Sequence, residues 1–348
     1  MNLSLRQNEI VLSILTGNTS LAKLNNLPPF REITDRTLQR DLSALVKDRV
    51  LTRHGEGRSV TYDVAPEGRL GIACPESLLE KILGDDKRDA VGYDFARLEL
   101  LSSNSLFSKA ENDDLQSYHH TFHSKLKSAP IDIVRRERER ITIELSWKSS
   151  QFEGNTYTLL ETESLLKEGI AARGRSDFET TMVLNHKKAL DFSAHHTDLF
   201  AGSITPRTII DLHKILIGDL DIGFGLRQHQ VAITGTAYQP LDNAFQIKEE
   251  LTKFCKVVNH KQSIFEKALL AFCYVSYLQP FNDGNKRTGR ILANAILYAH
   301  DTFPLSLRAI DVNTYKLAML AFYEFGIVGN AKQAFIEQAK FATENYAI

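Results

Sequence analysis

The chain has 348 residues, 43% hydrophobic and 24% charged, which is the composition of an ordinary globular protein large enough for two or three domains. Its formal net charge of -1 excludes a global field that would draw it to nucleic acid or to a membrane, so any basic surface has to be local. No apolar run reaches the length of a signal peptide or a membrane span, and the three cysteines form no CxxC pair. We therefore expect a cytoplasmic protein with reduced core thiols and no membrane partner.

Residues 1–66 have the pattern of a small separate domain. Apolar residues at helical spacing predict three helices, the third capped by Thr34, and two strand-like runs follow with a glycine-rich turn between them. Three helices and then a β-hairpin are the element order of a winged helix-turn-helix, and the segment resembles that family. The expected elements are helices over 5–16, 20–24 and 35–48 and strands over 50–53 and 59–64.

The third of these helices is expected to turn a polar face outward. Long polar side chains on such a helix can reach phosphates and base edges in a DNA major groove, and an arginine in the hairpin turn can reach the backbone. The residues expected to contact DNA are Arg36, Thr37, Gln39, Arg40 and Arg58. The alternative is a domain that contacts only proteins, with solvated arginines, because Lys and Arg only slightly outnumber Asp and Glu in this segment.

The rest of the chain is predicted to be mostly helical. Residues 67–133 indicate a helical connecting region that begins near Pro66, and residues 134–348 indicate a larger all-α domain. One small β-hairpin is expected where the chain alternates from Gln230 and breaks at Gly235. The fold class is thus mainly α. Helices of the large domain are expected over 135–152, 156–169, 177–197, 206–217, 243–259, 263–278, 287–300, 311–325 and 330–345.

The stretch from Gln279 to Arg290 concentrates groups that bind phosphates. Gly284 and Asn285 permit a tight turn whose N–H groups point the same way, at the positive end of the following apolar helix. Arg287 and Arg290 are three residues apart and so share one face of that helix. Two guanidinium forks beside a set of backbone N–H groups would hold a polyphosphate.

Asp283 is the one carboxylate of this loop, which makes it the natural ligand for a Mg²⁺ ion that bridges phosphates. The loop is expected to be anchored on the core by Pro280 and Phe281. The alternative interpretation is a capped helix with surface arginines, which explains Gly284 and Arg290 separately but does not explain the whole cluster.

The loop resembles that of the Fic family, in the Fic/Doc superfamily, whose pattern is His-x-Phe-x-Asp/Glu-Gly-Asn-Gly-Arg-x-x-Arg. The positions that match in register are Phe281, Asp283, Gly284, Asn285, Arg287 and Arg290. The resemblance covers about residues 135–345 and implies a compact all-α domain that transfers AMP from Mg·ATP to a Ser, Thr or Tyr hydroxyl of a protein, the chain itself included. It assigns the metal to Asp283 and the nucleotide to Gly284, Asn285, Lys286, Arg287 and Arg290.

The resemblance also assigns the segment from Val231 to Pro240. It looks like the family's β-hairpin flap, which aligns a target peptide by strand addition. Its central residues are Ile233, Thr234 and Gly235.

A second family feature lies upstream of the loop, where Ser149 to Gly154 match the inhibitory pattern Ser/Thr-x-x-x-Glu-Gly/Asn. The resemblance implies an inhibitory helix at about residues 141–154 and an ion pair between Glu153 and Arg290. A carboxylate on Arg290 would remove the cation meant for the γ-phosphate, so inhibition would be internal. The alternative is a helix end with Gly154 as its left-handed cap, and both interpretations can hold together.

Two positions depart from the family pattern. Gln279 stands where the family has the histidine that takes the proton of the attacking hydroxyl, and a glutamine amide cannot accept a proton near neutral pH. Losing a positioned general base costs about 10²–10⁴ in rate, so we expect little or no transfer, whether Gln279 is natural or engineered. Lys286 replaces a glycine, as in Doc-type proteins that transfer phosphate instead of AMP.

The sequence therefore leaves more than one function open. The first hypothesis is a self-inhibited protein adenylyltransferase impaired by Gln279. The second is a nucleotide-sensing, DNA-binding transcriptional regulator without transferase chemistry, and Doc-like phosphate transfer is a variant of the first. A module that only pairs chains is the third, since winged helices and Fic domains often form homodimers.

Overall fold

The computed structural model describes residues 3–84 and 88–347, and it confirms the mainly α fold class, with 65% of residues in helices and 4% in strands. Contacts divide the chain into two compact units. One unit runs up to Asp89 and adds Leu317–Gln333, and the other comprises Ala90–Lys316 with Ala334–Ile348. Among the described helices, none combines the length and apolar character that crossing a bilayer requires.

The first unit begins with the element order expected from the sequence. Thr34 caps the third helix through a hydrogen bond from the N–H of Thr37, and the two strands pair antiparallel from Leu51 opposite Val64 to His54 opposite Thr61. The elements are α1 Leu5–Leu15, α2 Leu21–Asn25, α3 Asp35–Lys47, β1 Leu51–His54, β2 Thr61–Val64, α4 Pro66–Gly71 and α5 Glu76–Leu83, with short 3₁₀ turns at Pro28–Phe30 and Gly57–Ser59.

The chain does not break at Pro66, where the sequence indicated a boundary. Pro66 is the first residue of α4. Gly68 packs against Val50, the residue before β1, so closely that a Cβ at position 68 would lie 2.3 Å from the carbonyl oxygen of Val50. The core of this unit also includes Leu317, Ala321, Phe325 and Ile327, from the end of α16 (Val312–Leu320), a π-helical turn (Ala321–Phe325) and the residues after it. Local periodicity cannot indicate this packing because the partners lie far apart in the sequence.

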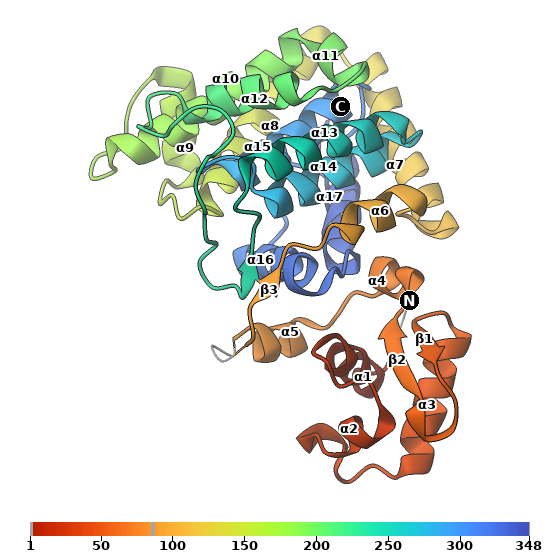
Figure 1. Cartoon of the computed structure of the whole chain (residues 1–348). Coiled ribbons are helices and arrows are strands. Elements are labelled where there is room, and N and C mark those ends of the chain that lie inside the picture. The colour runs from red at the N-terminus through yellow and green to blue at the C-terminus, as the bar shows by residue number, and fades with distance from the viewer. Residues whose placement is uncertain (1–2, 85–87, 348) are drawn as a thin grey trace. The chain divides into compact units, whose positions relative to one another are not determined.

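The second unit is a set of packed helices around α14 and α15, which lie side by side (Figure 1). α14 is apolar nearly all round and buried, as expected for a central helix, and α15 contacts α8, α10, α11 and α12 as well. The elements are β3 Val91–Gly92, α6 Ala96–Ser103, α7 Lys109–Ser128, α8 Ile131–Gln151, α9 Leu159–Glu168, α10 Asp177–His195, α11 Thr197–Ala201, α12 Pro206–Ile217, β4 Tyr238–Gln239, α13 Ala244–His260, α14 Ile264–Leu278, α15 Asn285–Tyr298 and α17 Gly329–Asn345, of which α17 begins in the first unit.

The expected hairpin at residues 230–240 is wrong. Ile233 has no regular structure and Thr234 and Gly235 form a turn, but no strand precedes it. The one strand in this segment, β4, instead pairs in parallel with β3, with Val91 opposite Tyr238. The partner comes from a segment far upstream, which alternation within residues 230–235 could not reveal.

Gly68→Ala is expected to destabilise the protein by about 1–3 kcal/mol, because the added methyl group overlaps the Val50 carbonyl and the backbone has to move. Urea denaturation measures the effect. Gly92→Ala is the matched control, since nothing lies within 4 Å of a Cβ at that position. Equal stability of the two variants would contradict the close packing of α4 on β1.

Candidate active site

The site is built at the bend between α14 and α15. Two residues there adopt the left-handed conformation, Gln279 with φ 50° at the end of α14 and Gly284 with φ 77° before α15. A Cβ on Gly284 would also approach Ile217 Cγ2 at 3.1 Å, so glycine suits this position on both grounds. The bend lies against Ile217 and His213 of α12, and the first turn of α15, whose N–H groups have no partner within the helix, begins there.

Asn285 fixes the shape of the bend from inside. Its Oδ1 accepts from the N–H of Phe281 at 2.8 Å, and its Nδ2 donates to the carbonyl of Phe281 and to Oε1 of Gln279, each at 2.9 Å. Phe281 is fully buried and stacks on His213 with ring centroids 3.6 Å apart. The expected anchoring of the loop by Phe281 is confirmed.

Gln279 bonds to its own loop through both polar atoms of its side chain. Its Nε2 donates to the carbonyl of Ser276 at 2.6 Å and its Oε1 accepts from Asn285, so both polar atoms of this buried amide are satisfied within the bend. An amide held in this way neither takes a proton nor changes charge near neutral pH. As the structure stands, position 279 stabilises the loop.

Arg227 ties the bend to the segment that leads to β4. Its guanidinium is buried and donates to the carbonyls of Gln279 at 2.6 Å, of His229 at 2.8 Å and of Leu241. Its backbone N–H donates to the carbonyl of Pro280 at 3.0 Å. The arginine therefore ties both ends of the 229–241 loop to the bend, and the flap role of Ile233, Thr234 and Gly235 within this loop stays a prediction.

Asp283 is the exposed carboxylate of the bend. Its side chain is 58% exposed, its Oδ1 accepts from the N–H of Gly284 at 2.6 Å and its Oδ2 pairs with Arg287 at 3.1 Å. Mg²⁺ bound with a nucleotide ordinarily takes one or two carboxylates, phosphate oxygens and water, and this accessible carboxylate fits that role. Among residues 3–84 and 88–347, no group of three or more His, Cys, Asp or Glu could hold a metal by itself.

Arg287 is buried and has two nitrogen donors without a partner among the described residues. Its side chain is 2% exposed, and its Nε and Nη1 have no hydrogen-bond partner among the described residues, although Nη2 reaches Asp283. Burial lowers the pKa of this guanidinium, which Asp283 and Glu153 partly oppose. A desolvated cation with unused donors is a site where an anion is strongly favoured.

Arg290 is the opposite case, because its donors are already occupied. Nε donates to Ser149 Oγ at 2.8 Å, Nη1 to Tyr315 Oη at 2.9 Å, and Nη2 to both the Ser149 carbonyl at 2.9 Å and Glu153 Oε1 at 2.7 Å. The rings of Phe152 and Tyr315 stack on each other, and the guanidinium lies 5.5 and 5.4 Å from their respective centroids. The ion pair expected between Glu153 and Arg290 is confirmed.

Glu153 binds a second cation of the bend. Its Oε2 pairs with Lys286 Nζ at 3.2 Å, so one carboxylate engages two of the residues expected to hold phosphates. Burial would raise the pKa of Glu153, but Arg290, Lys286 and Arg287 together lower it to about 2. The helix itself ends at Gln151, and Glu153 lies in the turn beyond it, where Gly154 adopts φ 89°, the left-handed conformation expected for it.

Ser149 belongs to a hydrogen-bonded chain that the sequence did not indicate. His186, fully buried on α10, donates through Nδ1 to the carbonyl of Met182 at 2.9 Å and accepts at Nε2 from Ser149 Oγ at 2.8 Å. Burial lowers the pKa of His186 to about 3, so the ring is neutral. These hydrogen bonds link His186 through Ser149 to Arg290, and only tertiary contacts bring the three residues together.

The residues expected to contact DNA lie in the first unit. Arg36, Gln39 and Arg40 are exposed on α3, Thr37 is half-buried and bonded to Thr34, and Arg58 is exposed in the turn between β1 and β2. The apolar face of α3, with Leu38, Leu42 and Leu45, is buried as expected. These side chains are accessible to a ligand, and their role remains a prediction.

Comparison with known proteins identifies the domain that carries the bend. Residues 203–297 match the model of the Fic/DOC family. The chain contains a Fic/DOC family domain. It is 30% identical over 207 residues to "Protein adenylyltransferase Fic" of Drosophila mojavensis, covering 58% of this chain and 39% of the relative. It is also 30% identical over 180 residues to the protein of the same name from Nematostella vectensis, covering 49% and 40%. The chain thus spans about two fifths of the length of these relatives.

Solved structures of Fic proteins share the fold. Fic-1 (residues 134–508) from C. elegans aligns with a TM-score of 0.56 at 20% identity, over 72% of this chain and 80% of that one. A Fic family protein from Desulfovibrio desulfuricans G20 aligns with a TM-score of 0.55 at 16% identity, over 68% and 74%. The helical arrangement around the bend is therefore that of Fic folds.

The Glu153 ion pairs are expected to stabilise the fold throughout the neutral range and to weaken only in strong acid. Because the folded-state pKa of about 2 lies below the ordinary value of 4.5, the contribution is complete above pH 5 and declines as the pH falls toward 2. The measurement is the difference in unfolding free energy between the protein and Glu153→Gln, followed from pH 8 to pH 2. A difference that grows on acidification would contradict the assigned ion pairs.

Proposed function

We propose that the chain is a Fic-type protein adenylyltransferase scaffold that binds Mg·ATP at the bend from Gln279 to Arg290 and is held inactive by Glu153. The observation that carries the proposal is the contrast between two buried arginines on one helix. Arg287 keeps unused donors, whereas Arg290 is saturated by Glu153, Ser149 and Tyr315. The names of the relatives support adenylyl transfer over Doc-like phosphate transfer.

The phosphates would be held by this chain's own groups in a definite order. Arg287 and the first N–H groups of α15 provide the open positions, and Asp283 would hold Mg²⁺, which neutralises phosphate charge when bound. The Fic resemblance assigns the γ-phosphate to Arg290. With Glu153 on Arg290 and Lys286, the carboxylate would repel that phosphate and leave the triphosphate in a non-productive position.

Transfer requires a proton acceptor for the attacking hydroxyl, and Gln279 does not supply one. Its amide is bonded to Ser276 and Asn285, and an amide does not remove a proton from a hydroxyl near neutral pH. His186 does not replace it, because both of its ring nitrogens are bonded inside the fold, to Met182 O and Ser149 Oγ. His213 donates through Nε2 to Asp283 O, and burial lowers its pKa to about 4, which makes its remaining nitrogen a weak proton acceptor. Nucleotide binding is thus preserved while the chemical step is slow.

Two changes together are expected to restore transfer. Glu153→Gly releases Arg290 and Lys286, and Gln279→His introduces a base, which is worth about 10²–10⁴ in rate. Mass spectrometry of the protein and of co-purified proteins after incubation with Mg·ATP detects the added AMP. The expected order of AMP incorporation is the double variant, then Gln279→His, then the unaltered chain.

The matched control adds Arg287→Ala to the double variant, which removes the open guanidinium but leaves the base and the free Arg290. It is expected to lose labelling and to bind ATP more weakly in calorimetry. Absence of AMP on any protein from the double variant, with ATP binding intact, would refute adenylyl transfer.

A second candidate activity is DNA binding by the first unit. Its support is the observed element order of three helices and an antiparallel hairpin, with Arg36, Gln39 and Arg40 exposed on α3 and Arg58 in the hairpin turn. This is the arrangement in which a winged helix-turn-helix inserts its third helix into the major groove. A chain of this kind would combine a nucleotide site with a DNA-binding unit and act as a regulator.

Arg36→Ala and Arg40→Ala are each expected to weaken binding to double-stranded DNA, and the loss of a phosphate contact reduces the slope of log K against log salt by about 1. Fluorescence anisotropy with mixed-sequence duplexes at several salt concentrations measures both. Arg207→Ala, an exposed arginine on α12 in the other unit, is the control. An unchanged salt slope in both α3 variants would exclude α3 as the DNA-contacting helix.

A further inference from the structure

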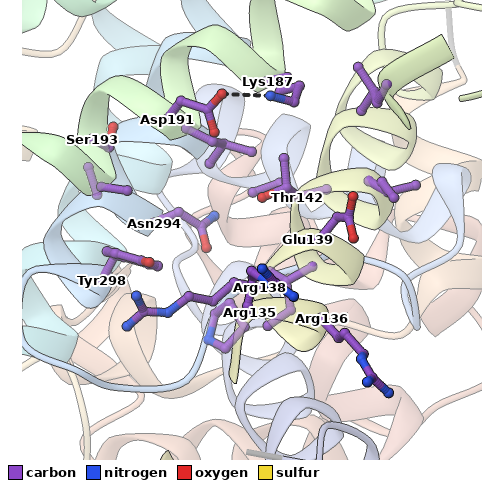
Figure 2. Close-up of a pocket in the computed structure, with 18 of the residues that line it drawn as sticks. Arg135, Arg136, Arg138, Glu139, Thr142, Lys187, Asp191, Ser193, Asn294 and Tyr298 are labelled. Atoms are coloured by element: carbon purple, nitrogen blue, oxygen red, sulfur yellow. Dashed lines mark hydrogen bonds and ion pairs between the residues drawn. The ribbon is translucent and has the colours of Figure 1, made fainter. Parts of the chain in front are cut away.

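A cavity lies in the Fic-fold unit among helices that include α8 and α15, which carry Ser149 and Arg290. It has a volume of about 540 Å³, within the range of sites for small organic molecules, and is formed between α7, α8, α10 and α15 (Figure 2). None of the residues of the 279–290 bend lines it. The cavity is therefore not the nucleotide site described above.

The wall of this cavity is mainly apolar. Ile141 and Leu145 of α8 face it, with Leu190 and Ala194 of α10 and Ala295 of α15. Ile141, Leu190 and Ala194 remain only half-buried, because they border the empty volume. An apolar body of matching size would cover this surface and be stabilised by roughly 25 cal/mol for each Å² of apolar surface removed from water.

Of the described residues, five cationic and three acidic side chains line the cavity, the acidic ones being Glu139, Asp191 and Asp301. In Figure 2, Arg135, Arg136 and Arg138 lie on one side and the Lys187–Asp191 ion pair on the other. Lys187 and Asp191 satisfy each other at 2.8 Å, and Arg136 pairs with Asp132 at 3.3 Å.

The guanidinium groups of Arg135 and Arg138 have no carboxylate partner among the described residues. Among the described residues Arg135 has no hydrogen-bond or ion-pair partner, and Arg138 lies over the ring of Tyr298 at 5.0 Å without a carboxylate. Of the acidic groups in the lining, Asp301 pairs with Lys127 at 3.2 Å. Glu139 adds to the effect of Glu163 in raising the pKa of Lys167, which also lines the cavity.

A buried polar atom in the lining also lacks a partner. The side chain of Thr302 is 4% exposed, and its Oγ1 makes no hydrogen bond to any described residue. Leaving such a group unsatisfied costs about 1–3 kcal/mol, so a ligand or water that bonded it would be favoured. Beside it, Asn294 uses its amide on the carbonyls of Arg290 and Leu305.

We propose that this cavity binds a small amphipathic anion, with its apolar body against Ile141, Leu190 and Ala194 and its acidic group at Arg135 and Arg138. A single carboxylate fits a guanidinium fork by two parallel hydrogen bonds, and neither arginine has to give up an existing carboxylate partner. The site lies beside the helix that ends in the Ser149–Glu153 contacts and beside α15, which carries Arg290.

Decanoate is a suitable probe, titrated calorimetrically into the whole chain without nucleotide. We expect saturable binding at one site, and no binding of decyltrimethylammonium, which has the same tail and the opposite charge. Arg138→Gln is expected to weaken decanoate binding about tenfold or more, as for the loss of a charged hydrogen bond. Arg207→Gln, equally exposed and away from the cavity, is expected to leave it unchanged.

Ala194→Phe and Leu190→Trp fill the cavity from the same wall, and each is expected to abolish binding while circular dichroism shows a folded protein. Equal binding of the anion and the cation, or binding that survives both filling variants, would overturn the proposal. Displacement of decanoate by excess Mg·ATP would also overturn it, because the probe would then occupy the bend. Since no nucleotide is present in the main titration, the result does not depend on whether the chain transfers AMP.

Discussion

The arrangement of the Fic-fold unit depends on the burial of one positive charge, the guanidinium of Arg290. It is fully buried, and an isolated cation in that position would be unstable because burial removes it from water. The surrounding helices compensate with specific partners: Ser149 and Glu153 at the end of α8, Tyr315 on α16, and His186 on α10 acting through Ser149. Removing one partner of a buried ion pair typically costs about 3–5 kcal/mol, so this constraint holds α8, α10, α15 and α16 together.

The same requirement links stability to the proposed control of the site. In the proposed control, the contacts that satisfy Arg290 are those that keep it from a phosphate, so breaking the Glu153–Arg290 pair would require a new anion in the same place. A triphosphate could fulfil that role once Glu153 leaves, and Glu153 would have to give up Lys286 at the same time. Arg287 needs no such exchange, since two of its nitrogens are unpaired among the described residues.

Rigid and adjustable parts of the site are therefore separated. Asn285 and Arg227 fix the path of the bend through bonds to backbone groups, and Phe281 on His213 adds an apolar anchor. These contacts involve neutral acceptors or stacked rings, so none of them uses a charge for which a phosphate would compete. The proposed control acts instead through the charged groups Glu153, Lys286 and Arg290.

Much of this could be predicted from the sequence. The helices follow from apolar periodicity, and α12 falls on the residues expected. The bend was recognisable because its acid, glycine, amide and cations are consecutive, and the Glu153–Arg290 pair was inferred from a family resemblance. The errors arose where a partner was distant: the strand β4 pairs with β3, and residues near 317–327 complete the core of the first unit.

The sequence by itself determined the helical pattern, the left-handed glycine of the bend and the set of charges at it, because these depend on neighbours a few residues apart. Only the tertiary structure decided which charges are available, since that depends on burial and on partners from other helices. It left Arg287 with unused donors, saturated Arg290, turned Gln279 inward and opened an apolar cavity beneath Arg138 and Tyr298. Such properties arise when helices distant in sequence pack together and exclude water.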